Sequence, residues 1–206
     1  TFQADGQVFH PLDTTVINLD GAWQMRVTHA LPPAADDAAA YTDAGITAEA
    51  RALVRESVSG GAWTAVTLPA MVPFFRDHDG EAVFRRKVEV PRSESGKDMV
   101  LSLGALDDFD DTFFNGVQVG HTDSKTQNWW QQRRVYTVPG RLVKPGRNVI
   151  AVRLFDRFND GGFAGNGGLP MSLTPKQAGR SAESYYHADY RTDFPFGDDP
   201  YRYYRW

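Results

Sequence analysis

The stretch LSLGALDDFDDTFFNGVQVG, residues 101–120, decides the fold class of this chain. Leu101 and Leu103 alternate with small or polar residues, as a half-buried strand requires. Asn115-Gly116 then separates two runs of strand-forming residues. This dipeptide is the preferred two-residue hairpin turn, because both of its positions adopt positive φ. The stretch therefore predicts an antiparallel hairpin that directly follows another strand.

The same pattern of short strands between turns continues on both sides of the hairpin. Ile150, Val152 and Leu154 alternate on one face, and Lys144-Pro145-Gly146 is the turn before them. Helical spacing occurs only at about residues 47–58, where Thr47 is the candidate N-cap. This arrangement favours an all-β antiparallel β-sandwich, with a jelly roll as the expected architecture. The expected strands lie at residues 16–27, 63–68, 83–90, 99–103, 112–119, 135–138, 149–155 and 171–173.

Three segments fall outside the strand pattern. Residues 30–60 are small, polar and Pro-bearing, and are predicted to be a surface insertion that carries the helix. The loop at residues 70–82 contains Phe74-Phe75, which we expect to be exposed. The sandwich domain is assigned to residues 1–177. The tail at 178–206 has six Tyr residues and few aliphatic ones, so we expect it to pack on the sandwich through its rings.

Composition excludes several classes of function. A net charge of −4 over 206 residues argues against a nucleic-acid partner, which favours a basic face. The absence of cysteine excludes thiol catalysis, zinc-thiolate sites and disulfides. No apolar run approaches the ~18 residues of a membrane span, so no membrane partner is expected. No G-x-S-x-G motif occurs, and no spacing singles out a carboxylate pair for glycoside hydrolysis, so we expect no catalytic residues.

An acidic cluster precedes the hairpin. Asp107, Asp108, Asp110 and Asp111 lie within five residues. Carboxylates accept hydrogen bonds from sugar hydroxyls and also suit Ca²⁺. The alternation of a dedicated calcium loop is missing, and the alternative is a solvated turn in which Asp bonds to the nearby backbone. The five histidines show no metal-ligand spacing, so a structural Ca²⁺ is the one cofactor that stays an alternative.

Aromatic and basic residues follow the hairpin. Trp129 and Trp130 are the best binding candidates, because the apolar face of a sugar stacks on an indole. Neighbouring residues of a strand face opposite ways, so we expect only one indole to be exposed. The alternative is that one or both indoles cover the sandwich edge. Arg133 and Arg134 either donate to sugar hydroxyls or pair with the acidic cluster.

A third candidate loop is rich in glycine. Asp156, Asn159 and Asp160 lie in it, and glycine lets a backbone approach a ligand closely. The alternative is a simple flexible turn. The predicted site combines this loop, residues 156–168, with the loops at 107–111 and 126–134. It requires that all three loops share one end of the sandwich.

Several motifs carry a resemblance to a known family. They are WTAVTLP at 63–69, FRRKVEVP at 84–91, the stretch at 101–120, the run from 136 to 153 ending in NVIAVR, and DRFNDGG at 156–162. Over about residues 16–174 the chain resembles the sugar-binding jelly-roll domain of family 2 glycoside hydrolases. A similar domain occurs in sialate O-acetylesterases, and both belong to the galactose-binding-like group.

The resemblance implies an ancillary sandwich of a carbohydrate-active enzyme. In that family the catalytic carboxylates lie on a separate barrel, and the loop corresponding to 156–168 reaches toward its active site. Our main hypothesis is a non-catalytic carbohydrate-binding module of a secreted or periplasmic polysaccharide-degrading enzyme. Its expected partners are a polysaccharide or oligosaccharide and a catalytic domain of the same chain. The alternatives are a purely structural sandwich that packs on a barrel, and a β-sandwich enzyme in its own right.

Overall fold

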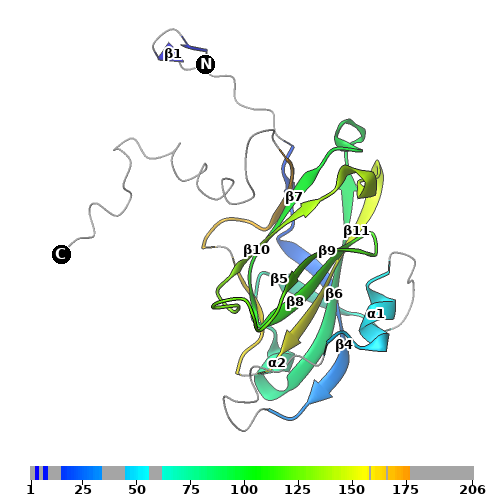
Figure 1. The fold of residues 1–206 in the computed structure, drawn as a ribbon, viewed down its shortest axis with the longest axis vertical. Coiled ribbons are helices and arrows are strands. Elements are labelled where there is room, and N and C mark those ends of the chain that lie inside the picture. Colours follow the sequence, from blue (N-terminus) through cyan, green and yellow to red (C-terminus); the bar gives the residue numbers. More distant parts are fainter. Residues whose placement is uncertain are drawn as a thin grey trace, which may run out of the picture.

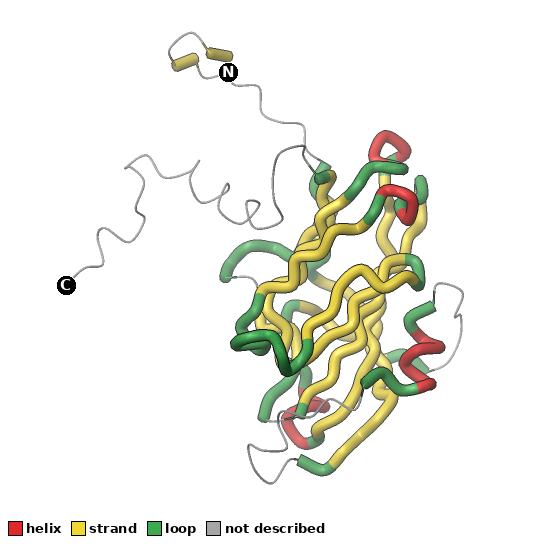
Figure 2. Tube along the Cα trace, viewed as in Figure 1, coloured by secondary structure: helices red, strands yellow, loops and turns green. Residues whose placement is uncertain are grey.

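The computed structural model describes residues 3–4, 7–8, 15–33, 45–55, 62–157, 159–165 and 167–176. Within these ranges the chain forms two antiparallel sheets that pack face to face, with few helical residues (Figures 1 and 2). The predicted all-β sandwich is therefore confirmed. The tail at 178–206 and the insertion at 34–44 and 56–61 lie outside the described residues, so the assigned domain boundaries stay a prediction.

The two sheets differ in size and order. The five-stranded sheet has the order β10 (Arg133–Val138), β7 (Met99–Asp107), β13 (Ser172–Pro175) and β3 (Ile17–Asn18), with β12 (Gly162–Gly165) also paired to β7. The six-stranded sheet has the order β5 (Thr64–Leu68), β4 (Gly21–Leu31), β6 (Asp79–Val90), β11 (Gly146–Asp156), β8 (Phe109–Phe114) and β9 (Val117–Thr122). A separate pair consists of β1 (Gln3–Ala4) and β2 (Gln7–Val8).

The core lies between the inner faces of the two sheets. On β11 the predicted row of Ile150, Val152 and Leu154 is fully buried. Val152 lies opposite Phe84 of β6, and Leu101 of β7 enters the same core from the other sheet. Because side chains alternate along a strand, the next inward position of β11 is Asp156, at the end of the row.

Arg86 interrupts the apolar face of β6, and its hydrogen-bond partners explain how a charged side chain is accommodated there. Its guanidinium donates to the carbonyls of Asp20, Ala22 and Asn18 at 3.1–3.2 Å. It also lies over the ring of Trp23, 5.9 Å from the centroid. The guanidinium is therefore bound by backbone carbonyls of the segment that connects β3 in one sheet to β4 in the other.

The hairpin predicted at Asn115-Gly116 is present between β8 and β9. Both residues have positive φ, 50° and 80°, as the turn requires. The Asn115 amide also donates to the Asn148 side chain and to the Leu142 carbonyl, each at 2.8 Å. The turn is thereby joined to the short 3₁₀ helix η3 (Gly140–Leu142).

The predicted helix is present as α1 (Ala48–Leu53), on the outer face of the six-stranded sheet (Figure 1). Thr47 is its N-cap, and its hydroxyl accepts from the Ala50 amide. The same hydroxyl donates to Glu81 at 2.5 Å, and Arg153 donates to the other Glu81 oxygen at 2.8 Å. Burial alone raises the pKa of Glu81, but its hydrogen bonds to Thr28, Thr47 and Arg153 hold it below its ordinary value.

The expectation that Phe74 and Phe75 are exposed is wrong. They lie in a one-turn helix, α2 (Pro73–Asp77), which begins at a proline, a favoured first residue. Phe75 is 1% exposed and belongs to the core, while Phe74 is half-buried and stacks on His78. A second 3₁₀ helix, η2 (Arg92–Glu94), follows β6. None of the helices in the described ranges is long and apolar enough to cross a membrane.

Candidate functional site

The three predicted loops meet at one end of the sandwich, around α2 in Figure 1. The Trp129 indole donates to Asp108 Oδ1 at 3.0 Å, and the Arg157 amide donates to Asp108 Oδ2 at 3.2 Å. The Val72 amide donates to the Gly161 carbonyl at 2.9 Å, which brings the loop at residues 70–79 to the same end. The geometric condition for the predicted site is met. Contact with a ligand stays a prediction.

The two indoles have different environments, as expected, although they lie in a turn rather than a strand. Trp129 is 9% exposed and packs on Phe109 and Trp130, with ring centroids 5.4 and 5.3 Å away. Trp130 is 40% exposed. Trp129 therefore forms part of the loop scaffold, and the face available for a ligand belongs to Trp130.

Arg134 and Asp110 are interior residues. Arg134 Nε donates to Asp110 Oδ1 at 2.8 Å, and both side chains are fully buried. The guanidinium also donates to the carbonyls of Asp108 and Trp129. Tyr136 donates to Asp110 as well, at 3.0 Å. Of the alternatives for Arg134, the ion pair with the acidic cluster is observed, so its predicted contact with a sugar is corrected to a role in joining two loops.

Asp111, next to Asp110 on β8, lies on the outer face of the six-stranded sheet. One of its oxygens accepts from Gln118 at 2.9 Å and lies 2.8 Å from His121 Nδ1. Its other oxygen is 3.6 Å from Arg153. The alternation of β8 thus directs Asp110 toward the core and Asp111 toward the outer face of the six-stranded sheet.

Asp156 is the unusual residue of this end. It is fully buried, and neither of its carboxylate oxygens has a hydrogen-bond partner within the described residues. Burial, with the nearby charges of Asp108 and Asp107, raises its pKa to about 10. Gly161 lies against it so closely that a Cβ there would be 2.5 Å from Asp156 Cγ. Such a group costs stability and is typical of functional sites.

Asp107 and Asp108 lie beside Asp156 at the junction of β7 and β8. Asp108 is buried, with both oxygens used by Trp129 and Arg157. Asp107 is half-buried, and burial raises its pKa, helped by the adjacent Asp108. The alternative of a simply solvated turn is therefore wrong for this pair. The carboxylates form an acidic floor under the loops.

The remaining predicted residues form an exposed rim. Asn159 and Asp160 are exposed, and Asp160 is 3.6 Å from Arg76 of α2. Arg133 is exposed, and a Cβ on Gly167 would lie 3.2 Å from its guanidinium. The rim therefore joins the glycine-rich loop to the loop at 126–134.

Two neighbours of the site were missed by the sequence analysis. Met71 is 38% exposed and its backbone pairs with Gly162. Arg157 lies 3.7 Å from the buried Asp79. Met71 and Arg157 have no local pattern that distinguishes them, whereas the paired glycines 161–162 are a signal of close backbone approach. Among the described residues, no group of three or more His, Asp or Glu side chains is arranged to hold a metal ion.

No model of a known protein family matches this chain, and no curated protein matches it. Solved structures do resemble it. A β-glucuronidase from an uncultured Clostridium sp. matches with a TM-score of 0.57 at 16% identity, over 83% of this chain and 31% of that one. A β-glucuronidase from Bacteroides uniformis matches with 0.55 at 15%, over 79% and 18%. A family 2 glycosyl hydrolase from Bacteroides cellulosilyticus matches with 0.53 at 16%, over 78% and 20%.

At this identity the likeness shows the fold. The sandwich is one that also occurs within family 2 glycoside hydrolases, the family that the sequence motifs resemble. This chain spans between 18% and 31% of the length of those proteins. Their activity belongs to much longer chains.

Proposed function

We propose that this chain is a non-catalytic, sugar-binding sandwich of a multidomain carbohydrate-active enzyme. The single observation that carries the proposal is the position of Trp130. Its exposed indole lies at the end of the sandwich where the three predicted loops meet, beside an acidic floor. A flat aromatic face with hydrogen-bond acceptors around it is the arrangement that suits a pyranose ring.

The buried acidic floor supports the same proposal. An unpartnered Asp156 beside Asp107 and Asp108 lowers the stability of the free domain, and proteins retain such groups mainly at functional sites. The half-buried Asp107 and the exposed Asp160 are the acceptors nearest to solvent. We assign stacking to Trp130, and hydrogen bonding to sugar hydroxyls to Asp107, Asn159, Asp160 and Arg133.

Affinity electrophoresis tests the proposal. Soluble xylan, galactomannan and mixed-linkage β-glucan in the gel are the probes, and we expect at least one to retard the protein. Replacing Trp130 by Ala removes the flat apolar face on which the proposed binding depends, so it should abolish that retardation. Val117→Ala is the matched control, since Val117 is 43% exposed at the start of β9, outside these loops.

The outcomes separate the three functions. Retardation lost in Trp130→Ala and kept in Val117→Ala supports sugar binding. No retardation by any polysaccharide contradicts it. Release of reducing sugar by the chain alone would establish instead a β-sandwich enzyme.

A second candidate function is docking on a catalytic domain. Met71 and Trp130 are large exposed apolar residues at the same end, and the structural neighbours are three to six times longer than the matched region. This function predicts no glycan binding by the chain alone. It also predicts that Met71→Ser weakens association with the rest of the parent enzyme while Val117→Ser does not.

A further inference from the structure

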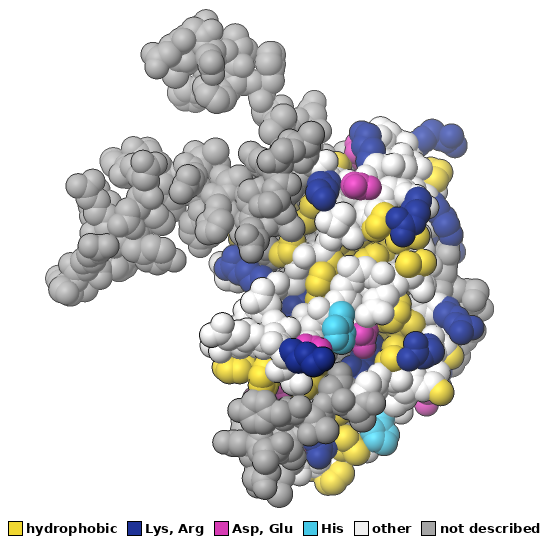
Figure 3. Space-filling view, viewed as in Figure 1, with side chains coloured by type: hydrophobic (Ala, Val, Ile, Leu, Met, Phe, Trp, Pro, Cys, Tyr) yellow, Lys and Arg dark blue, Asp and Glu magenta, His cyan; other side chains and the backbone are white. Residues whose placement is uncertain are grey.

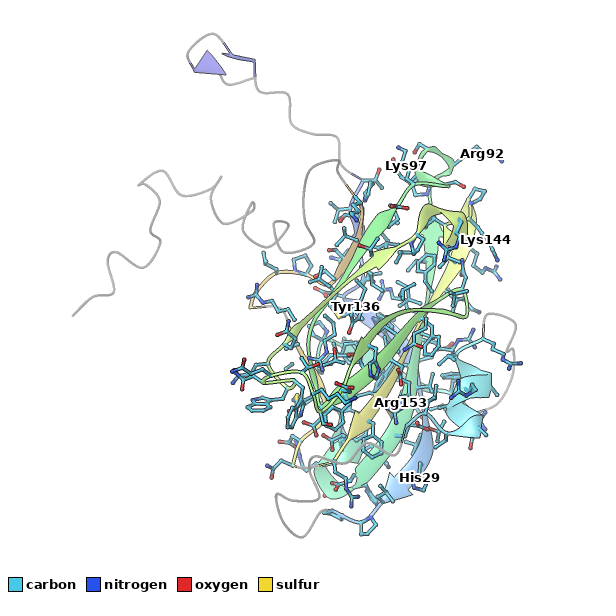
Figure 4. The ribbon with its side chains drawn as sticks, in the orientation of Figure 1. His29, Arg92, Lys97, Tyr136, Lys144 and Arg153 are labelled. Atoms are coloured by element: carbon cyan, nitrogen blue, oxygen red, sulfur yellow. The ribbon has the colours of Figure 1, made fainter. Side chains whose placement is uncertain are left out.

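The end of the sandwich opposite the candidate site is rigid and basic. β11 runs the length of the molecule, from Gly146 at this end to Asp156 at the loop end, about 33 Å away for a strand of this length. Figure 4 shows Arg92, Lys97 and Lys144 together at this upper end. In Figure 3 dark blue side chains outnumber magenta ones there.

Hydrogen bonds fix the two loops that form this end. The Gly96 amide donates to the Val143 carbonyl at 3.1 Å, and the Gly140 amide donates to Asp98 Oδ1 at 2.7 Å. A Cβ on Gly140 would lie 2.1 Å from the Gly96 carbonyl oxygen, so the two backbones are in close contact. The basic side chains therefore project from a preorganised surface, which lowers the entropic cost of binding.

The fully buried Asn148 holds the neighbouring turn. Its amide donates to the carbonyls of Lys144 and Gly146 at 2.8 and 2.9 Å, and its oxygen accepts from the Lys144 amide at 3.0 Å. Asn115 donates to the same oxygen, which ties the hairpin to this end. The turn that precedes Arg147 is therefore held by hydrogen bonds from Asn148 to Lys144 and Gly146.

Three guanidinium groups at this end are available. Arg92, Arg141 and Arg147 are exposed, and within the described residues their side chains make no hydrogen bond or ion pair. Lys97 pairs with the buried Glu94 at 3.0 Å. Among the described residues of this end, the exposed acids are Glu89, across from Arg147 in the sheet, and Asp98, which accepts from the backbone. Positive charge exceeds negative charge here, in a chain whose net charge is −4.

We propose that this end, formed by η2, η3 and the start of β11, is a second binding surface, and that it takes an anionic polysaccharide through its carboxylate or sulfate groups. Arg92, Arg141 and Arg147 make the principal contacts. A guanidinium binds such planar or tetrahedral oxyanions through two parallel hydrogen bonds, which a lysine does not offer. The surface would attract any polyanion, and this part of the proposal does not depend on the proposed function. The choice of a polysaccharide as the polyanion rests on the proposed carbohydrate-related function.

The test compares polymers of one kind that differ in charge. Polygalacturonate supplies carboxylates, dextran sulfate supplies sulfate esters, and dextran is neutral. Binding to each is measured by calorimetry at 20 and 300 mM NaCl. We expect binding to polygalacturonate, dextran sulfate or both at 20 mM, strong weakening at 300 mM as salt screens the charges, and none to dextran.

Two triple variants complete the experiment. Arg92→Gln, Arg141→Gln and Arg147→Gln together should weaken the affinity about tenfold, the sum of three exposed charge contacts. Arg51→Gln, Arg55→Gln and Lys125→Gln change the net charge equally, but these three exposed residues lie outside the basic end. They should change the affinity less than about twofold. Thermal unfolding confirms that both variants fold.

The proposal is overturned by any of three results. They are no binding to either anionic polymer, equal loss in both triple variants, or equal binding of a double-stranded DNA oligomer through the same three arginines. Trp130→Ala leaves this binding unchanged, because Trp130 lies at the other end. A glycan bound through Trp130 without any effect of the arginines would keep the proposed function and remove this one. Binding that depends on the three arginines, with no glycan bound through Trp130, would keep this proposal and remove the proposed function.

Discussion

Asp156 shows how a single residue connects the fold with the site. Its inward position follows from the alternation of Ile150, Val152 and Leu154, so the sequence already contains its direction. Its lack of a partner does not follow from the sequence, because it depends on Gly161 and Asp108, which come from other loops. A residue pattern predicts which way a side chain points, but not what it meets.

Replacing Asp156 by Asn should stabilise the free domain at pH 8. The folded-state pKa of Asp156 is about 10, above its ordinary value of 3.8, so the folded state holds a proton that the unfolded state has lost. The free energy of unfolding of the wild type therefore falls as pH rises from about 4 toward 10. The neutral amide removes this dependence and should add about 1–3 kcal/mol at pH 8. Urea unfolding at pH 5 and pH 8 measures both effects.

Asp160→Asn is the matched control, because that carboxylate is exposed and lies in the same loop. It should change the free energy of unfolding by less than about 0.5 kcal/mol. A wild type equally stable at both pH values, or an Asp156→Asn variant less stable at pH 8, would show that the carboxyl is partnered and charged.

Arg134→Met should destabilise the domain by about 3–5 kcal/mol, because it leaves the buried Asp110 carboxylate without its cation. Arg133→Met, the exposed neighbour, should cost less than about 0.5 kcal/mol. The two free energies of unfolding are measured by urea denaturation. An equal loss of unfolding free energy in the two variants would contradict the assignment of Arg133 to the surface and Arg134 to the interior.

At the scale of elements, the strands and the hairpin were predictable and the short helices only in part. Strand alternation and Asn115-Gly116 are local signals, and both led to the observed sheets. Thr47 as an N-cap is also local and correct. α2 was missed because one turn of helix has no period to detect, and Phe75 is buried by contacts from distant parts of the chain.

Thr47→Ala should loosen α1. The change removes the cap on the Ala50 amide and one hydrogen bond to Glu81, at a cost of about 1–2 kcal/mol. Hydrogen exchange of the α1 amides should accelerate more than exchange in β7, which lies in the other sheet. Thr64→Ala, at an exposed position of β5, is the control and should leave α1 exchange unchanged. Unaltered α1 exchange in Thr47→Ala would contradict the anchoring of this helix through Glu81.

At the scale of the whole molecule, the two ends of the sandwich differ in character. One end gathers aspartates and an exposed indole, and the other gathers exposed arginines on fixed loops. Composition alone hides this, because a net charge of −4 averages over both ends. The sequence predicted the loop end, since acidic, aromatic or glycine residues cluster within each of its three loops. The basic end joins η2 to η3 and the start of β11, which lie more than 40 residues further along the chain and meet η2 only in the fold.

The central claim is that the loop end binds sugar through Trp130. An NMR titration of the ¹⁵N-labelled chain with xylohexaose, mannohexaose and a mixed-linkage glucan hexasaccharide tests it most directly. The claim predicts that one of these shifts the Trp130 indole N–H together with amides of residues 107–108 and 159–162, while η2 and η3 stay unshifted. Shifts confined to η2 and η3, or no shift of the Trp130 indole with any of the three, would contradict it.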